Sequence, residues 1–482
     1  MIESVIFFFS GSGVVMLFIL FMRINVVGSK SKLVKHRSKE PGFVDLLIYA
    51  SVVDEGVIVG KDGSLMAAWA YQGVDSNSST EAERDQVSLQ INHALSRMGS
   101  GWMIHIDAVR KPAPGYSAKD DSHFPDPVSA AIDEERRDFF ERVGTLYESN
   151  YVITATYLPP LLAQQKFVEL MFDDEGVPVD SKTRTIALLN HFKRECANIE
   201  SHLSSVFRMK RLKGKTITKE DNSSVNYDAF LRWIQFCISG LDHPVILPKN
   251  PIYLDALLSG QEFWGGVVPK IGQNFIQVVS IEGFPLASSP GLINSLADLP
   301  CLYRWSTRFI FMDTHEAVGH LEKFSKKWKQ KIRSFFDQVF NSHSSNVDQN
   351  AINMVSDAQA AIAETNSGEV AQGYYTSVVV LMSESRGDLE ASARQVAKAI
   401  NHLGFAARIE SINTIDAYLG SLPGHGVENV RRPLLNTMNL ADLMPSNTVW
   451  PGKNEAPCPM YPPMAPPLMH CTTQGATPFR LN

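Results

Sequence analysis

Residues 374–382 read Y-Y-T-S-V-V-V-L-M, an apolar run that predicts a strand. The periodic segment 389–403 predicts a helix after it, and residues 405–409 predict a second strand. A strand, a helix and a strand in this order form a unit close to a split ferredoxin-like arrangement. We therefore expect a ferredoxin-like C-terminal part.

The segments before this unit also mix helices and strands. Asp62-Gly63 lies between two apolar runs and predicts a hairpin, and the helix predicted over residues 81–98 stops at Gly99. Further strands are predicted over residues 102–109, 151–157, 275–281 and 301–312, and further helices over 126–147, 183–207, 313–340 and 351–364. The predicted fold class is therefore α/β, of the mixed α+β kind.

A chain of 482 residues is long enough for two to four domains. Prolines recur from Pro445 to Pro467, where they disfavour helices and central strands and indicate a linker. The predicted parts are a membrane anchor (1–25), a basic juxtamembrane linker (26–42), a first α/β subdomain (43–160), a helical and α/β subdomain (161–345), a second α/β subdomain (346–440) and a proline-rich linker (441–482).

The uncharged run at residues 5–22 predicts a single N-terminal transmembrane helix. At about 1.5 Å per residue it reaches just under the ~30 Å of a hydrocarbon core. A signal peptide and a buried core helix are the alternatives, and Glu3 before the run together with Arg23 after it disfavours a signal peptide. Because basic residues gather between Arg23 and Lys39, we expect the amino terminus in the periplasm and the bulk of the chain in the cytoplasm.

The overall composition is that of an ordinary globular protein, with 44% hydrophobic and 20% charged residues. The chain has 45 Lys and Arg against 51 Asp and Glu, and its net charge of −6 argues against a surface that binds nucleic acid throughout. We therefore do not expect direct nucleic-acid binding, although a local basic patch remains an alternative. Five cysteines without a regular framework indicate a reducing compartment.

Two segments imitate parts of a nucleotide site. Gly214-Lys215-Thr216 ends like a phosphate-binding loop, but Met209 stands where such a loop needs its first glycine, so we prefer a solvated basic turn. Asp313 and Glu316 follow an apolar run as an Mg²⁺-binding acid pair would. The same spacing fits a helix N-cap and its third helical residue, and we favour the cap because no phosphate loop precedes it.

Soft metal ligands gather near the end of the sequence, at Cys458, Met460, Met464, Met469, His470 and Cys471. A proline-rich tract offers no scaffold that would make them converge on a metal ion. His191 with Glu195, and His315 with His320, fit the solvated face of a helix equally well. We predict no catalytic, cofactor-binding or metal-binding residue in this chain.

Arg431 and Arg432 lie in a segment bounded by glycine and proline. Two adjacent arginines could contact a phosphate or carboxylate of a neighbouring subunit, since the guanidinium fork suits both groups. The alternative is that they hold their own loop through ordinary ion pairs. The hypothesis kept for this pair is a contact in trans.

Several longer motifs resemble the amino-terminal half of one family. They are G-K-D-G-S-L at 60–65, L-S-R-M-G-S-G-W at 95–102, F-P-D-P at 124–127, D-E-E-R-R at 133–137, Y-L-D-A-L-L at 253–258, Y-R-W-S-T-R-F at 303–309 and all of 419–482. In these motifs the chain is similar to the TrbE/CagE family of type IV secretion (conjugal transfer) ATPases, from about Phe43 onward.

The resemblance implies an amino-terminal docking and assembly domain at the inner-membrane platform that supports pilus biogenesis and the transfer of DNA and protein. Full-length relatives use ATP and Mg²⁺ and form hexamers, but their phosphate loop would follow Asn482. The resemblance therefore carries over no catalytic residue and no cofactor. It leaves open whether the chain takes part in hydrolysis.

The resemblance also implies partners at the bacterial inner membrane. They are a TrbD-like subunit and other type IV secretion subunits, further copies of this chain, and a separately encoded ATPase half. The alternative function is an ATPase subunit that is completed across subunits or by a separately encoded motor domain.

Overall fold

The computed structural model describes residues 42–75, 79–159, 179–218, 224–248, 252–285, 287–339, 349–428, 431–473 and 475–482. The chain divides into two compact units, Met1–Leu47 and Ile48–Asn482. The first unit contributes the short helix α2 (Phe43–Leu46) to the described residues. The second unit holds the sheets and the other helices.

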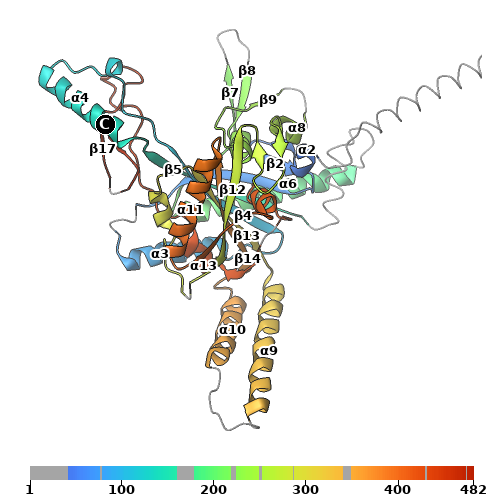
Figure 1. Cartoon of the computed structure of the whole chain (residues 1–482). Helices are drawn as coiled ribbons and strands as arrows, with labels where there is room; N and C mark the ends of the chain where they lie inside the picture. The colour runs from blue at the N-terminus through green and yellow to red at the C-terminus, as the bar shows by residue number, and fades with distance from the viewer. Residues whose placement is uncertain are drawn as a thin grey trace, which may run out of the picture. The chain divides into compact units, whose positions relative to one another are not determined.

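Thirteen strands of the described residues form one antiparallel sheet (Figure 1). Its neighbours in order are β1 (Tyr49–Asp54), β2 (Val57–Gly60), β3 (Leu65–Gln72), β5 (Tyr147–Tyr157), β4 (Trp102–Pro112), β13 (Tyr303–Phe311), β14 (Gln372–Ser383), β12 (Asn274–Gly283), β11 (Lys270–Ile271) and β10 (Phe263–Trp264). Three more strands join at the sides: β6 (Arg208–Arg211) pairs with β3, β15 (Ala406–Ile409) with β12, and β16 (Leu434–Asn436) with β14.

The strand-helix-strand unit predicted from residues 374–409 is present as β14, α11 (Arg386–His402) and β15. Strand β12 lies between β14 and β15 and is antiparallel to both. The other end of the sheet repeats this arrangement, because β5 lies between β3 and β4, which are joined through α3 (Glu81–Leu95). Each half of the sheet therefore contains a split β-α-β unit, and β13 joins the two halves between β4 and β14.

Two further groups of strands form smaller sheets. One holds β7 (Gly214–Thr218), β8 (Ser224–Asp228) and β9 (Ile246–Leu247), and the other holds β17 (Met469–Cys471) and β18 (Phe479–Leu481). The remaining helices are α4 (Pro127–Val143), α6 (Val179–Leu203), α7 (Ala229–Ser239), α8 (Leu254–Leu258), α9 (Thr314–Val339), α10 (Gln349–Ser367), α12 (Thr414–Gly420) and α13 (Thr437–Leu443), with 3-10 turns η1 (Lys119–Asp121) and η2 (Asn294–Asp298). Helices α9 and α10 pack together as a hairpin between the neighbouring strands β13 and β14.

The fold-class prediction is wrong in its transmembrane helix. In the part of the chain that the structure describes, no helix is both long and apolar enough to cross a bilayer. The run at residues 5–22, on which that prediction was placed, lies outside the described residues. A large antiparallel sheet with helices is the architecture that the structure supports.

The central strands are buried on both faces, and the two faces differ in chemistry. Alternate side chains of β4 and β13 point to opposite faces because a strand has a two-residue period. One face carries apolar side chains that join the main core beneath α3, α6, α11 and α13, among them Ile104, Ile106, Trp305 and Phe309. The other carries buried polar side chains, namely His105, Asp107, Arg304, Ser306 and Arg308.

Candidate functional site

The pairing of β4 with β13 brings the buried polar side chains together. Arg308 lies opposite His105, and Ser306 lies opposite Asp107, so these four residues share one face of the sheet. The cover over this face is the segment 420–428, which follows helix α12. We call this cover the glycine-rich segment, and we call Arg304 and Arg308 together the arginine clamp.

Arg304 binds both an acid and the start of the glycine-rich segment. Its Nη1 lies 2.9 Å from Asp107 Oδ1 and donates to the carbonyl oxygen of Ser421 at 2.8 Å. Its Nη2 donates to Ser421 Oγ at 2.6 Å. The fork of one guanidinium therefore joins the sheet to the segment above it.

Arg308 holds the rest of the segment through backbone carbonyls. Its Nη1 donates to the carbonyl oxygens of His425 at 2.9 Å and of Glu428 at 2.7 Å, with a longer contact of 3.3 Å to that of Gly420. A buried carbonyl outside helices and strands needs a donor from elsewhere. Arg308 supplies that donor to three carbonyls that are far from it in the sequence.

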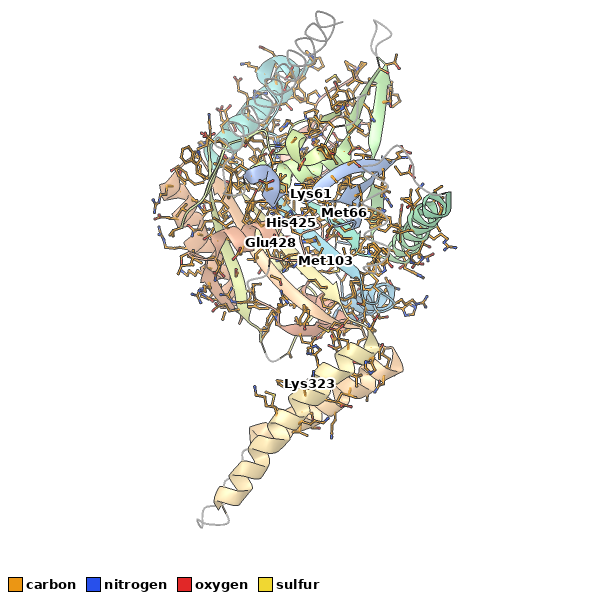
Figure 2. All side chains as sticks on the ribbon, turned by 90° about the vertical axis from the view of Figure 1, so that its right-hand side faces the viewer. Lys61, Met66, Met103, Lys323, His425 and Glu428 are labelled. Atoms are coloured by element: carbon orange, nitrogen blue, oxygen red, sulfur yellow. The ribbon has the colours of Figure 1, made fainter. Side chains whose placement is uncertain are left out.

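Close packing fixes the middle of the segment. The Tyr49 hydroxyl donates to the Pro423 carbonyl at 2.8 Å. Gly424 has φ +86°, and a Cβ there would lie 2.2 Å from Met66 Sδ. A Cβ on Gly426 would lie 3.4 Å from Met103 Sδ. Only glycine fits the closest approach, at position 424. Figure 2 labels His425 and Glu428 of this segment, and Met66 and Met103 of the sheet.

Burial dominates the electrostatics of this face. It raises the pKa of Asp107, and the Arg304 guanidinium opposes that rise. It lowers the pKa of Arg308 to about 10, which still leaves this arginine charged near neutral pH. Burial also lowers the pKa of His105 well below its usual value, an effect that nearby Arg308 increases. The hydrogen bond with His425 lowers the pKa of Glu428, whose Oε2 lies 3.3 Å from His425 Nδ1. The cluster therefore places two arginines beside the carboxyl groups of Asp107 and Glu428, next to the ring of His105.

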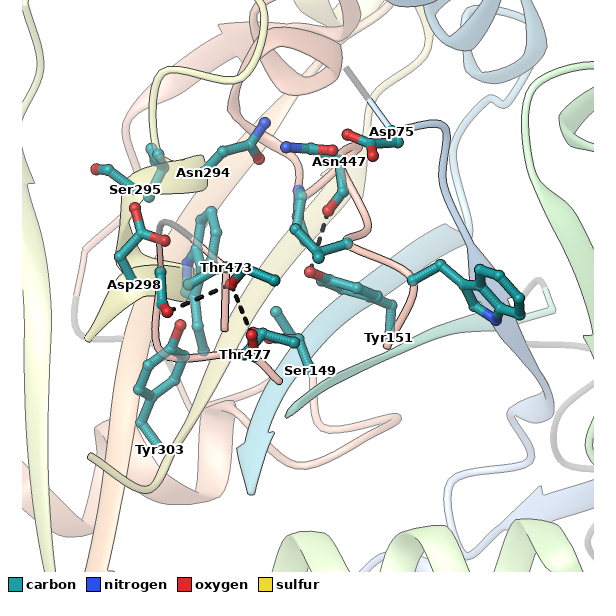
Figure 3. Close-up of a pocket in the computed structure, with 18 of the residues that line it drawn as sticks. Asp75, Ser149, Tyr151, Asn294, Ser295, Asp298, Tyr303, Asn447, Thr473 and Thr477 are labelled. Atoms are coloured by element: carbon teal, nitrogen blue, oxygen red, sulfur yellow. Dashed lines mark hydrogen bonds between the residues drawn. The ribbon is translucent and has the colours of Figure 1, made fainter. Parts of the chain in front are cut away.

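A cavity of about 570 Å³ lies on the opposite, apolar face (Figure 3). Its walls include Ala108, Tyr151 and Trp305 of the sheet, η2, residues of the segment 445–450, and Thr473, Gly475, Thr477 and Phe479 near the end of the chain. The Tyr151 hydroxyl donates to the Asn447 carbonyl at 3.0 Å, and Thr473 Oγ1 donates to the Thr477 carbonyl at 2.6 Å. Arg110 Nη1 of β4 also donates to Thr477 Oγ1 at 2.9 Å, so both segments are attached to the sheet beside this cavity.

The structure places the two predicted site residues differently. Arg431 forms ion pairs with Glu282 and with the buried Glu410, whose Oε1 lies 2.5 Å from Arg431 Nη1. Arg432 is exposed. The two adjacent arginines therefore do not act as one pair here: the first is bound within the chain, and the second faces solvent.

The two segments that imitate a nucleotide site have other roles. Gly214-Lys215-Thr216 lies in β7 and pairs with β8, so it does not precede a helix as a phosphate loop does. Asp313 directly precedes α9, and its carbonyl accepts from Ala317 N at 2.9 Å, as expected of a cap. Its carboxylate Oδ1 accepts from Ser100 N at 2.9 Å, so the side chain binds the loop before β4 and not its own helix.

The soft-ligand residues do not converge. Cys458, Met460 and Met464 are exposed, whereas His470 is buried beside the rings of Tyr116 and Phe140. Within the described ranges, no three residues of the types His, Cys, Asp and Glu are placed to hold a metal ion. The ring of His191 contacts Tyr157, and His320 Nε2 lies 4.0 Å from Glu316.

Sequence reasoning missed the arginine clamp. Its signal is the alternation Tyr303-Arg304-Trp305-Ser306-Thr307-Arg308-Phe309, in which two charges interrupt an apolar strand. An ordinary strand with one solvated face shows the same alternation. β13 differs from such a strand because its polar face is covered by a segment far along the chain.

The fold and the clamp define a sheet-based scaffold, and the comparisons with known proteins give its class. One family model, described as "Type IV secretion system ATPase VirB4/TrbE, N-terminal domain", matches residues 56–165. A second, described as "CagE, TrbE, VirB family, component of type IV transporter system", matches residues 215–431. Together these matches cover both split β-α-β units.

Curated relatives narrow the class. "Conjugal transfer protein TrbE" of Rhizobium radiobacter is 45% identical over 449 residues, which are 92% of this chain and 54% of that protein. Two relatives of Sinorhizobium fredii (strain NBRC 101917 / NGR234) are each described as one portion of a "Probable conjugal transfer protein TrbE". The second portion is 46% identical over 60% of this chain and 44% of its own length. The first portion is 49% identical over 26% of this chain and 84% of its own length.

The chain belongs to the TrbE family of conjugal transfer proteins, as the sequence motifs predicted. It spans about half the length of the Rhizobium radiobacter relative.

Proposed function

We propose that this chain is the docking and assembly module of a TrbE-type ATPase in a conjugal transfer apparatus. It supports pilus biogenesis and the transfer of DNA and protein by holding other subunits in place. In this proposal hydrolysis of ATP belongs to another part of the apparatus, and the cofactors ATP and Mg²⁺ bind there.

One observation carries this proposal, namely the attachment of strand β18 to the large sheet. Arg480 is 2% exposed, and its Nη2 lies 3.0 Å from Glu148 Oε2 of β5. Its backbone nitrogen donates to the Pro451 carbonyl at 2.8 Å, while β18 pairs with β17. A segment held in this way can transmit position and force to the sheet, as an assembly module requires.

We place this module at the cytoplasmic face of the bacterial inner membrane, where other secretion subunits hold it. TrbD-like subunits and further copies of the chain are the partners proposed. The reducing compartment indicated by five cysteines without a disulfide framework supports this location.

The alternative is an ATPase subunit whose hydrolytic site is completed across subunits or by a separately encoded motor domain. The names of the two Sinorhizobium fredii relatives describe TrbE in two portions, and both portions match parts of this chain, so they show a divided protein but do not place the division before a motor domain. Arg432 is the residue available for such a contact, since it is exposed while Arg431 is bound to Glu282 and Glu410.

Two measurements test the proposal. In the first, the purified chain is incubated with Mg-ATP, and we expect no hydrolysis above background and no effect of Lys215→Ala.

In the second, Arg480→Met is introduced into the gene in a conjugating strain, with Arg386→Met as control because Arg386 is exposed on α11. We expect Arg480→Met to reduce transfer at unchanged protein level and Arg386→Met to leave it unchanged. Hydrolysis that Lys215→Ala abolishes would contradict the docking role.

A further inference from the structure

Helix α4 has one face that the chain covers. Phe140 is buried and stacks on Tyr116 with ring centroids 5.6 Å apart. Arg136 Nη2 donates to the His470 carbonyl at 2.5 Å, and buried Asp133 accepts from the Tyr116 hydroxyl at 2.7 Å. These contacts fix the rotation of the helix about its axis, so the helix surface beside this covered face is turned outward.

The outward face carries a stripe of apolar side chains, which we call the α4 stripe. Its members are Val128, Ile132, Phe139 and Val143, and they are 66%, 55%, 45% and 45% exposed. At about 100° per residue the four positions fall within an arc of about 60°. Single exposed apolar residues are ordinary on a protein surface, but four in line along a whole helix are typical of a contact surface.

The spacing of the α4 stripe is symmetric about the middle of the helix. Val128 and Ile132 lie four residues apart at the start of the helix, and Phe139 and Val143 lie four residues apart at its end. A two-fold axis brings a helix against an antiparallel copy of itself, and such an interface must be self-complementary. A stripe with this symmetry fits a second copy of the same helix.

We propose that α4 is a self-association surface, on which two copies of this chain pack their α4 helices antiparallel. In this arrangement Val128 contacts the partner's Val143, and Ile132 contacts the partner's Phe139. Isolated pairs of such helices bury little area, so the contact strengthens an assembly that other interfaces also hold.

Glu135 sets the strength of this contact. It is exposed, lies midway along the α4 stripe, and flanks it at about 20° from the edge of its arc. The two-fold axis would bring the carboxylates of both copies near each other, and two like charges at an interface oppose association. The contact is therefore reversible, and replacing Glu135 with an apolar residue strengthens it.

Sedimentation velocity of the full chain over a range of concentrations tests this surface. We expect Ile132→Glu and Phe139→Glu to raise the dissociation constant for self-association by about tenfold or more, because each places a charge in the apolar contact. Leu89→Glu is the matched control, since Leu89 is 56% exposed on another helix, α3. We expect Glu135→Leu to lower the dissociation constant. Circular dichroism checks that each variant keeps its secondary structure.

Cysteine cross-linking tests the antiparallel register in a Cys458→Ser background. Positions 128 and 143 lie about 22 Å apart along one helix, too far for a bond within one chain. Val128→Cys with Val143→Cys should give a covalent dimer on oxidation, whereas Val128→Cys alone should not. Equal self-association of Ile132→Glu, Phe139→Glu and Leu89→Glu would overturn the proposal, as would a dimer from Val128→Cys alone at the yield of the double variant.

Discussion

Arg304 Nη1 lies 2.9 Å from Asp107 Oδ1, and both side chains are buried at the centre of the sheet. The same guanidinium binds the carbonyl and the hydroxyl of Ser421. The pair therefore neutralises a buried charge and also attaches the glycine-rich segment. Replacing Arg304 should affect the glycine-rich segment directly. Replacing Asp107 should not, because Arg304 then still binds Ser421.

The first prediction concerns Asp107→Asn. This change leaves the Arg304 charge buried without its anion, which typically costs about 3–5 kcal/mol of unfolding free energy. The double variant Asp107→Asn with Arg304→Met should recover part of that loss, since it removes the unpaired charge as well. Urea unfolding of the unmodified chain, Asp107→Asn, Arg304→Met and the double variant gives the coupling. Additive losses in the double variant would show that the pair is not coupled.

A second prediction concerns Arg308. Arg308→Met removes the donor for the carbonyls of Gly420, His425 and Glu428, each of which then loses a buried hydrogen bond. We expect hydrogen exchange of the amides in 420–428 to increase by about tenfold or more, while α11 keeps its protection. Unchanged exchange in that segment would mean that packing alone holds it.

Backbone geometry at Gly424 gives a third prediction. Alanine at this position must adopt φ near +86°, and its Cβ would meet Met66 Sδ. The strained backbone alone costs about 1–2 kcal/mol, and the displaced Met66 adds to this. Gly115 is a control, because a Cβ there meets no atom within 4 Å. Thermal melting should show a clear loss for Gly424→Ala and little change for Gly115→Ala.

Sequence periodicity placed the main strands around this site but not helix α12, since only the patterns of the strands are long enough to read locally. The apolar run at 374–382 became β14, and the helix predicted over 389–403 became α11. Pairing of β4 with β13 depends on segments far apart in the chain, so local periodicity does not reveal it. The buried face of β13 was missed for the same reason, because its cover lies beyond residue 419.

The contact in trans proposed for Arg431 and Arg432 stays a prediction, and the structure adds where each side chain lies within its own chain. Arg431 and Arg432 are adjacent in sequence, and nothing in the pattern separates them. The difference arises from Glu410, a buried acid at the end of β15 that only the fold brings to Arg431. The tail showed no scaffold in sequence, yet His470 is buried there, because α4 supplies the surface that covers it.

A fourth prediction separates the two arginines. Arg431→Ala leaves Glu410 buried without its cation and should lower the unfolding free energy by about 1–3 kcal/mol. Arg432→Ala should change it by less than about 0.5 kcal/mol, because the side chain is exposed. Urea unfolding measures both variants. If Arg432→Ala proved the more destabilising, the assignment of the ion pairs to Arg431 would be wrong.

The last prediction concerns acid stability at His470. Burial lowers the pKa of this imidazole to about 4, with Arg480 adding to the effect, whereas an unfolded histidine titrates near about 6.5. The unfolded chain therefore binds the proton first as the pH falls. The stabilising contribution is complete above pH ~6.5 and is lost progressively as the pH falls toward 4.

His470→Gln removes this titration, so its melting temperature should fall less than that of the unmodified chain between pH 7 and pH 5. Part of the acid dependence should remain, because burial lowers the pKa of His105 in the same direction. Parallel melting curves for the two proteins over that range would show that His470 takes up its proton equally in the folded and unfolded chains.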